Sequence, residues 1–256
     1  RRQRQMCIRD RSEEEFTDLK INWLIKKQRS DLIENFLKQN EEFKSKSKAV
    51  QFLVDENISK ANIEEGCNKI KFIDAKIKDA YLEKFKIYCL VFNNKKSEAQ
   101  LLLNLLREQK QSDKFYDDKI NFLLGVTNKT TSKINESNLL NFYLSSITNK
   151  EFNFKPNKNT KEAIWKYLNA SNLIRLEDAS DKKRLKELEL AANLGQIDND
   201  TIFKIYQQVP FKLNQLINAK NIYPTLPEGE ARPLIYQKYL LSENIDSKVE
   251  YLFLLE

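Results

Sequence analysis

The spacing of apolar residues constrains the fold of this chain more than any other feature of its sequence. Apolar side chains recur every three to four residues along almost its whole length, as in the set Leu82, Phe85, Cys89 and Phe92. A helix places residues with this spacing on one side. Runs in which β-branched and polar residues alternate, which would indicate half-buried strands, do not occur in the sequence. The spacing therefore predicts an all-α protein.

Helix-start signals recur at a regular interval in the first half of the chain. They are separated by 33, 34 and 34 residues and lie at Ser12, Ser45, Asp79 and Asp113. This interval is typical of stacked helical hairpins. The small residue Ala99 and the larger Leu103 and Leu106 also match the second helix of a tetratricopeptide repeat. We predict an irregular, tetratricopeptide-like α-solenoid of antiparallel helical hairpins, with a compact helical bundle as the alternative.

The first and fourth helices have their own start signals. Ser12 and Glu15 form the pattern of a capping box, and an apolar stripe follows at Phe16, Leu19, Trp23, Leu24 and Ile25. Because large aromatic side chains usually fill protein interiors, we expect Trp23 in the core. Ser59 is expected to open the fourth helix.

The chain divides by composition into four segments. Residues 1–11, RRQRQMCIRDR, resemble the translated read-through of a sequencing adapter, and without their net charge of +4 the chain falls from +7 to +3. Residues 12–147 are expected to form helical-hairpin repeats. Pro156 and four asparagines make residues 148–159 a candidate loop or hinge. Residues 160–256 are expected to form a second helical segment, and we expect both ends of the chain to be truncated.

The residue types that are missing exclude most catalytic chemistry. The sequence has no histidine, so it lacks Ser-His-Asp and Cys-His catalytic sets and imidazole metal ligands. Its four glycines are too far apart to form a loop that cradles phosphate. The carboxylate runs at residues 13–15 and 117–118 fall in or near first helical turns or on outward faces, where they complement the helix dipole. We therefore expect no enzyme activity, no cofactor and no metal site.

Charge and hydropathy also narrow the partners. The basic residues at positions 44, 46 and 48, and those at 182–186, are interpreted as solvated faces, because acidic residues dilute the second cluster. With a corrected net charge of about +3, no nucleic-acid partner is expected. The longest apolar runs fall far short of the roughly 20 residues that span a bilayer, so no integral membrane segment is expected.

Several stretches resemble a family of uncharacterised helical-repeat proteins of Gram-negative bacteria. The resemblance covers roughly residues 30–256 and rests on EGCNKIKFI, YLEKFKIYCLVFNNKKSEAQLLLNLLREQ, IDNDTIFKIYQQVPF and GEARPLIYQKYLL. It implies a longer precursor with an export signal, an α-helical repeat fold and no known activity. The implied compartment is the periplasm, with the cytoplasm as the alternative.

Cys67 and Cys89 form a candidate disulfide, since Cys7 belongs to the adapter-like segment. If their helices form a hairpin that turns near Lys78, equal arms bring the two sulfurs to one level. The export implied by the resemblance favours a bond, because oxidising compartments maintain disulfides. The alternative is two free cysteines buried as small apolar residues. A zinc site is disfavoured because two cysteines without histidine supply too few ligands.

A group of aromatic residues is the candidate groove. Its members are Phe152, Phe154, Trp165 and Tyr167, and core packing is the alternative for Trp165 and Tyr167. Together with the repeat interval and the missing catalytic groups, the group favours a non-catalytic scaffold of the cell envelope that binds a protein or peptide. The alternative function is a helical accessory domain of a larger envelope enzyme.

Overall fold

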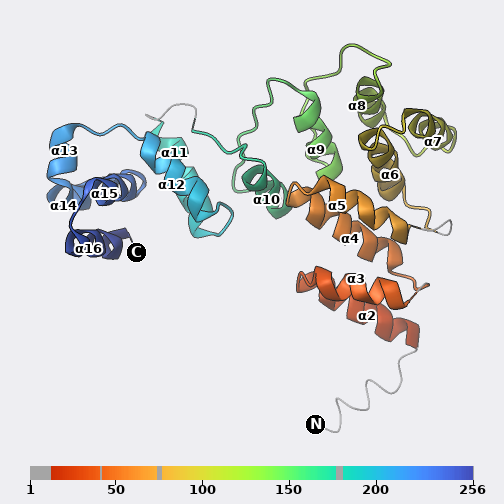
Figure 1. Cartoon of the computed structure of the whole chain (residues 1–256), viewed down its shortest axis with the longest axis horizontal. Coiled ribbons are helices and arrows are strands. Elements are labelled where there is room, and N and C mark those ends of the chain that lie inside the picture. Colours follow the sequence, from red (N-terminus) through yellow and green to blue (C-terminus); the bar gives the residue numbers. More distant parts are fainter. Residues whose placement is uncertain (1–12, 41, 74–76, 177–180, 256) are drawn as a thin grey trace, which may run out of the picture. The chain divides into compact units, whose positions relative to one another are not determined.

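A computed structural model describes residues 13–40, 42–73, 77–176 and 181–255 (Figure 1). Its regular elements are all helices, and the described residues contain no strand, which confirms the prediction of an all-α protein. The chain separates into two units, Arg1–Asn153 and Phe154–Glu256. The boundary lies within residues 148–159. Ser12 and residues 1–11 lie outside the described part.

The first unit contains most of the helices that the repeat interval concerns. They are α2 (Glu13–Lys26), α3 (Ser30–Gln39), α4 (Lys46–Ser59), α5 (Ile63–Asn68), the 3-10 helix η1 (Lys69–Phe72), α6 (Ala80–Phe92), α7 (Lys96–Glu108), α8 (Lys114–Leu124) and α9 (Leu139–Thr148). Helices α2, α4, α6 and α8 begin 33, 34 and 34 residues apart. The helix starts of the structure thus repeat at the interval that the sequence indicates.

Packing in the first unit joins helices that are close in sequence, with one exception. Helix α2 packs against α3, α4 against α5, and α6 against α7, while α4 also contacts both α2 and α6, and α6 contacts α8. The exception is α9, which packs against α4 and α8 and reaches α6 through Tyr143. Most of the side chains of α9 are buried. Helices α4, α6 and α8 therefore share a surface that α9 covers.

Side-chain caps explain two of the regularly spaced starts. The carboxylate of Asp79 accepts hydrogen bonds from the backbone N–H groups of Tyr81 and Leu82 at the start of α6. Asp113 accepts one from the N–H of Tyr116 at the start of α8. Such caps satisfy donors that a helix leaves unpaired in its first turn. Gly125 ends α8 with φ of 81°, the left-handed conformation that glycine adopts without a steric penalty.

The expected helix start at Ser59 is wrong. Ser59 is the last residue of α4, and its hydroxyl donates to the backbone oxygen of Glu56. The next helix, α5, is capped instead by Asn62, whose side chain accepts from the N–H of Glu65. The serine pattern misled because a hydroxyl can bond backward to its own helix as readily as forward to the next.

The expected burial of Trp23 is also wrong. The Trp23 side chain is 55% exposed, and Phe16 and Leu19 are 48% and 53% exposed. The buried residues of α2 are Ile21 and Leu24, which lie on a different side of the helix. Since α3 and α4 are the helices that pack against α2, one of its two apolar faces remains uncovered.

The second unit contains the remaining helices. They are α10 (Glu162–Ala170), α11 (Lys182–Asn193), α12 (Asn199–Gln208), α13 (Leu213–Ile217), α14 (Ala219–Ile222), the 3-10 helix η2 (Tyr223–Thr225), α15 (Glu228–Leu241) and α16 (Ile245–Leu255). Helix α15 contacts α11, α12, α13, α14 and α16 and is the centre of this part. A core cluster there contains Ala219, Leu234, Ile235 and Tyr251.

Candidate functional site

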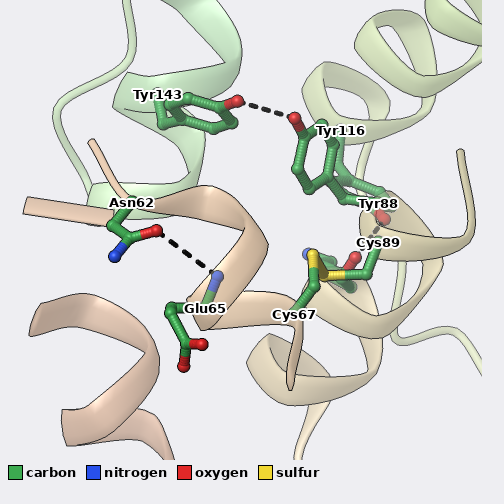
Figure 2. Close-up of a disulfide and its surroundings, with 8 residues drawn as sticks. Asn62, Glu65, Cys67, Tyr88, Cys89, Tyr116 and Tyr143 are labelled. Atoms are coloured by element: carbon green, nitrogen blue, oxygen red, sulfur yellow. Dashed lines mark hydrogen bonds between the residues drawn. A yellow bond between two sulfur atoms is a disulfide. The ribbon is translucent and has the colours of Figure 1, made fainter. Parts of the chain in front are cut away.

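The structure brings Cys67 and Cys89 together in a disulfide (Figure 2). Their Cα atoms are 5.5 Å apart, within the range of about 4.4–6.8 Å that a disulfide needs. Cys67 lies on the short helix α5 and Cys89 in the third turn of α6. Both residues are buried, at 9% and 1% exposure. The bond therefore joins two consecutive helices from inside the first unit.

The surroundings of the disulfide are tightly packed (Figure 2). The hydroxyl groups of Tyr88 and Tyr143 are hydrogen-bonded at 2.6 Å, which links α6 to α9. Tyr116 donates from its hydroxyl to the backbone oxygen of Lys84 at 2.6 Å. A Cβ atom on Gly66 would lie 3.2 Å from Cζ of Phe85, so α5 and α6 approach closely here. Burial, helped by the charges of Asp117 and Asp113, raises the pKa of Tyr116 well above its usual value. These contacts make the region a structural joint.

Two further buried tyrosines are bonded to carboxylates. The Tyr81 hydroxyl donates to Asp55, and the Tyr206 hydroxyl donates to Glu189 at 2.5 Å. Burial and then the carboxylates raise the pKa of both phenols well above the usual value of 10. Both phenols remain protonated donors at neutral pH, so these pairs hold helices together and supply no base.

The carboxylates singled out in the sequence also take part in local structure. Asp117 accepts from Arg107 at 3.0 Å and from the Ser112 hydroxyl at 2.5 Å. Asp118 accepts from the backbone N–H of Thr131 at 2.9 Å. Among the described residues, no three or more Cys, Asp or Glu side chains are placed to hold a metal ion.

The four aromatic residues of the candidate groove occupy different environments. Phe152 belongs to the first unit and packs edge-on against Phe142, with ring centroids 5.7 Å apart. The other three belong to the second unit, where Tyr167 is buried and Phe154 is half-buried. Only Trp165 lines a pocket among the described cavities.

This pocket, called here the Trp165 pocket, lies wholly within the second unit. Its volume is about 280 Å³, and its lining residues are Asn157, Lys158, Asn159, Trp165, Glu187, Leu190, Ala191, Leu194 and Gln196. They come from the loop before α10, from α10 itself, from α11 and from the residue that follows Gly195. The Trp165 ring is 2% exposed, whereas Leu190 and Leu194 on α11 are 56% and 65% exposed. The pocket thus combines a buried aromatic residue with an open leucine wall.

Hydrogen bonds tie the walls of the Trp165 pocket together. Arg184 of α11 donates from Nη1 to the backbone oxygen of Pro156 at 2.8 Å, which attaches the loop to α11. Asn169 of α10 donates from its side-chain nitrogen to the backbone oxygen of Gln196. The loop is also held internally, since Asn157 accepts from the N–H of Asn159 at 2.8 Å. The pocket is therefore formed by segments that are fixed to one another.

Sequence reasoning found only one residue of this pocket. The exposed Leu190 and Leu194 lie four positions apart on α11, a signal that also describes a buried stripe. Asn157 and Asn159 were interpreted as residues of a hinge. A helical period cannot tell which of two apolar faces a neighbouring helix covers, because that depends on tertiary packing.

Comparison of the chain with protein-family models, with curated proteins and with solved structures found no match. No helix in the described part of the chain has the length and apolar character needed to cross a membrane.

Proposed function

We propose that this protein is a non-catalytic helical-repeat scaffold of the cell envelope that binds a protein or peptide partner. The observation that carries the proposal is the Trp165 pocket, in which exposed leucines stand beside a buried tryptophan and side-chain amides. Sites that bind partners commonly combine an apolar surface with a small number of polar groups. None of the perturbed tyrosines described above lines this pocket, so its chemistry suits binding.

The repeat character of the first unit supports the scaffold. Helices α2, α4, α6 and α8 start 33 to 34 residues apart, and each contacts the next in this series. We interpret the unit as an irregular α-solenoid of antiparallel, tetratricopeptide-like hairpins. In that interpretation, α9 occupies the surface shared by α4, α6 and α8, which leaves the partner to bind elsewhere.

The buried disulfide supports a location in the periplasm. Compartments that keep thiols reduced rarely contain structural disulfides, whereas the bacterial periplasm maintains them. The bond between Cys67 and Cys89 joins two helices of the fold, as structural disulfides do.

Two measurements on periplasmic material from cells that carry the native gene test this proposal. Alkylation followed by mass spectrometry should find Cys67 and Cys89 unreactive until a reductant is added. Chemical crosslinking should repeatedly recover the same partner with this protein. Two freely reactive thiols would contradict the location, and repeated failure to recover any protein or peptide would contradict the scaffold.

A further inference from the structure

We propose that the Trp165 pocket binds one large apolar side chain of an extended, uncharged peptide segment, while its amide side chains bind the backbone on either side. This inference rests on the proposed function and names the chemistry of its partner. The occupant would be a leucine-like or phenylalanine-like residue of the partner chain.

The size of the pocket favours a single side chain. Pockets for drug-sized ligands have volumes of about 300–1,000 Å³, and the Trp165 pocket, at about 280 Å³, is smaller than that range. Leu190, Leu194 and Ala191 supply an aliphatic wall along α11. An apolar side chain that enters would bury surface from both partners, which is favourable in proportion to the area removed from water.

The polar residues of the pocket match a peptide backbone. Asn157, Asn159 and Gln196 each carry a carboxamide, which contains both a donor and an acceptor, as a peptide group does. The indole Nε1 of Trp165 is buried and has no hydrogen-bond partner in the described structure. Buried donors of this kind are uncommon in native proteins, and a peptide carbonyl is a suitable acceptor.

The charges of the pocket favour an uncharged segment. Lys158 and Glu187 have opposite signs, and Glu187 is already 3.2 Å from the guanidinium of Arg184. The aliphatic wall offers no countercharge to an acidic or basic side chain. Such a side chain would lose its hydration without compensation, so the pocket should reject it.

The test uses the complete chain with Trp23 replaced by phenylalanine, which leaves Trp165 as the single indole. The probes are blocked tripeptides, acetyl-Gly-X-Gly-amide, with X as Leu, Phe, Ala, Glu or Lys. The indole ¹H–¹⁵N resonance of Trp165 should shift in a saturable way with Leu and Phe. Binding with Ala, Glu and Lys should be weaker by about tenfold or more, because those side chains lack the buried apolar surface.

Matched leucine variants assign the shift to the pocket. Leu194→Ser removes part of the wall and should weaken binding of the Leu peptide about fivefold. Leu213→Ser is the control, because Leu213 is 72% exposed on α13 and does not line the pocket. Both positions are exposed, so both variants should fold, which circular dichroism checks. Equal affinities of the two variants would overturn the proposal.

A second probe separates a peptide from a small apolar molecule. Isovaleramide carries the leucine side chain without the flanking backbone, and it should bind at least about threefold more weakly than the Leu peptide. Equal binding would overturn recognition of a backbone, and the absence of a saturable shift with every peptide would overturn the pocket as a peptide site.

Crosslinking with the Leu194→Ser variant separates this inference from the proposed function. If the variant loses peptide binding but still recovers the partner, the partner binds elsewhere and this inference is wrong while the scaffold stands. If the tripeptides bind as expected but no partner is ever recovered, the scaffold proposal fails instead.

Discussion

At the scale of single residues, Lys69 shows how a charged group links helices in the first unit. Its ammonium group lies 2.8 Å from Glu34 of α3 and 3.1 Å from Glu65 of α5, and the Lys69 side chain is 11% exposed. Burial lowers the pKa of Lys69, but hydrogen bonds to the two carboxylates outweigh this effect and raise it overall. One buried cation thus joins α3, α5 and η1.

Replacing Glu34 tests this link and its pH dependence. The Lys69 hydrogen bond holds the pKa of Glu34 below its usual value of 4.5, although burial opposes the shift. Glu34→Gln should therefore lower the free energy of unfolding by about 1 kcal/mol at neutral pH. A carboxylate with a lowered pKa stabilises the fold above about pH 4.5 and loses that effect as pH falls through its folded pKa. The difference between the two proteins should thus shrink below that pH in urea denaturation. The exposed Glu108→Gln is the control, and an equal effect there would contradict the link.

The hydroxyl pair of Tyr88 and Tyr143 gives a second prediction. Each single Tyr→Phe replacement should destabilise the protein by about 1 kcal/mol, because it removes one partner of a buried hydrogen bond. The double replacement should cost less than the sum of the two, since it removes both partners. Thermal denaturation of the four proteins measures this coupling, and strictly additive effects would contradict it.

At the scale of elements, the disulfide holds a short helix in place. Helix α5 spans only Ile63–Asn68, which is too short to be stable by itself, and it continues into η1. The bond to α6 and the close contact of Gly66 with Phe85 hold α5 against its neighbours.

Removal of the disulfide should lower stability substantially. The bonded residues are 22 positions apart, for which the chain-entropy model predicts about 3 kcal/mol. Cys67→Ala with Cys89→Ala should lose about this amount in urea denaturation. The parent protein, once reduced, should move toward the same stability. No change on reduction would show that the bond does not constrain the unfolded chain.

The contact of Gly66 gives the matching prediction for packing. A Cβ atom at this position would lie 3.2 Å from Phe85 and 3.3 Å from Asn57. Gly66→Val should therefore destabilise the protein by about 1–3 kcal/mol through overpacking. Gly66→Ala should cost less, because only the first carbon must be accommodated and alanine favours a helix. Thermal denaturation compares the two, and a fully stable valine variant would contradict the close approach.

At the scale of the whole molecule, the chain consists of two units with separate buried residues. The boundary between Asn153 and Phe154 lies beside the exposed residues Lys150 and Lys155. The other long connection, residues 126–138, is attached to the first unit. Lys119 donates to the Thr131 oxygen at 2.5 Å, and Asn135 donates from its N–H to the Ser145 hydroxyl at 3.1 Å.

Brief digestion with trypsin tests this difference. Cleavage at Lys150 or Lys155 should precede cleavage at Lys129 or Lys133, because a protease needs a segment that can leave the surface. Mass spectrometry identifies the first fragments within residues 77–176. Earlier cleavage in the 126–138 connection would contradict the division at residue 153.

The sequence by itself determined the all-helical class, most helix positions and the 33 to 34 residue interval. Caps such as Asp79 and Asp113 act within one turn, so local residues suffice to predict them. Only the tertiary structure decided which apolar faces are covered. It leaves Trp23 exposed on α2, buries α9 against α4 and α8, and brings Trp165 beside Leu190 and Leu194. Helical periodicity shows that a face is apolar, whereas burial depends on which distant segment packs against it.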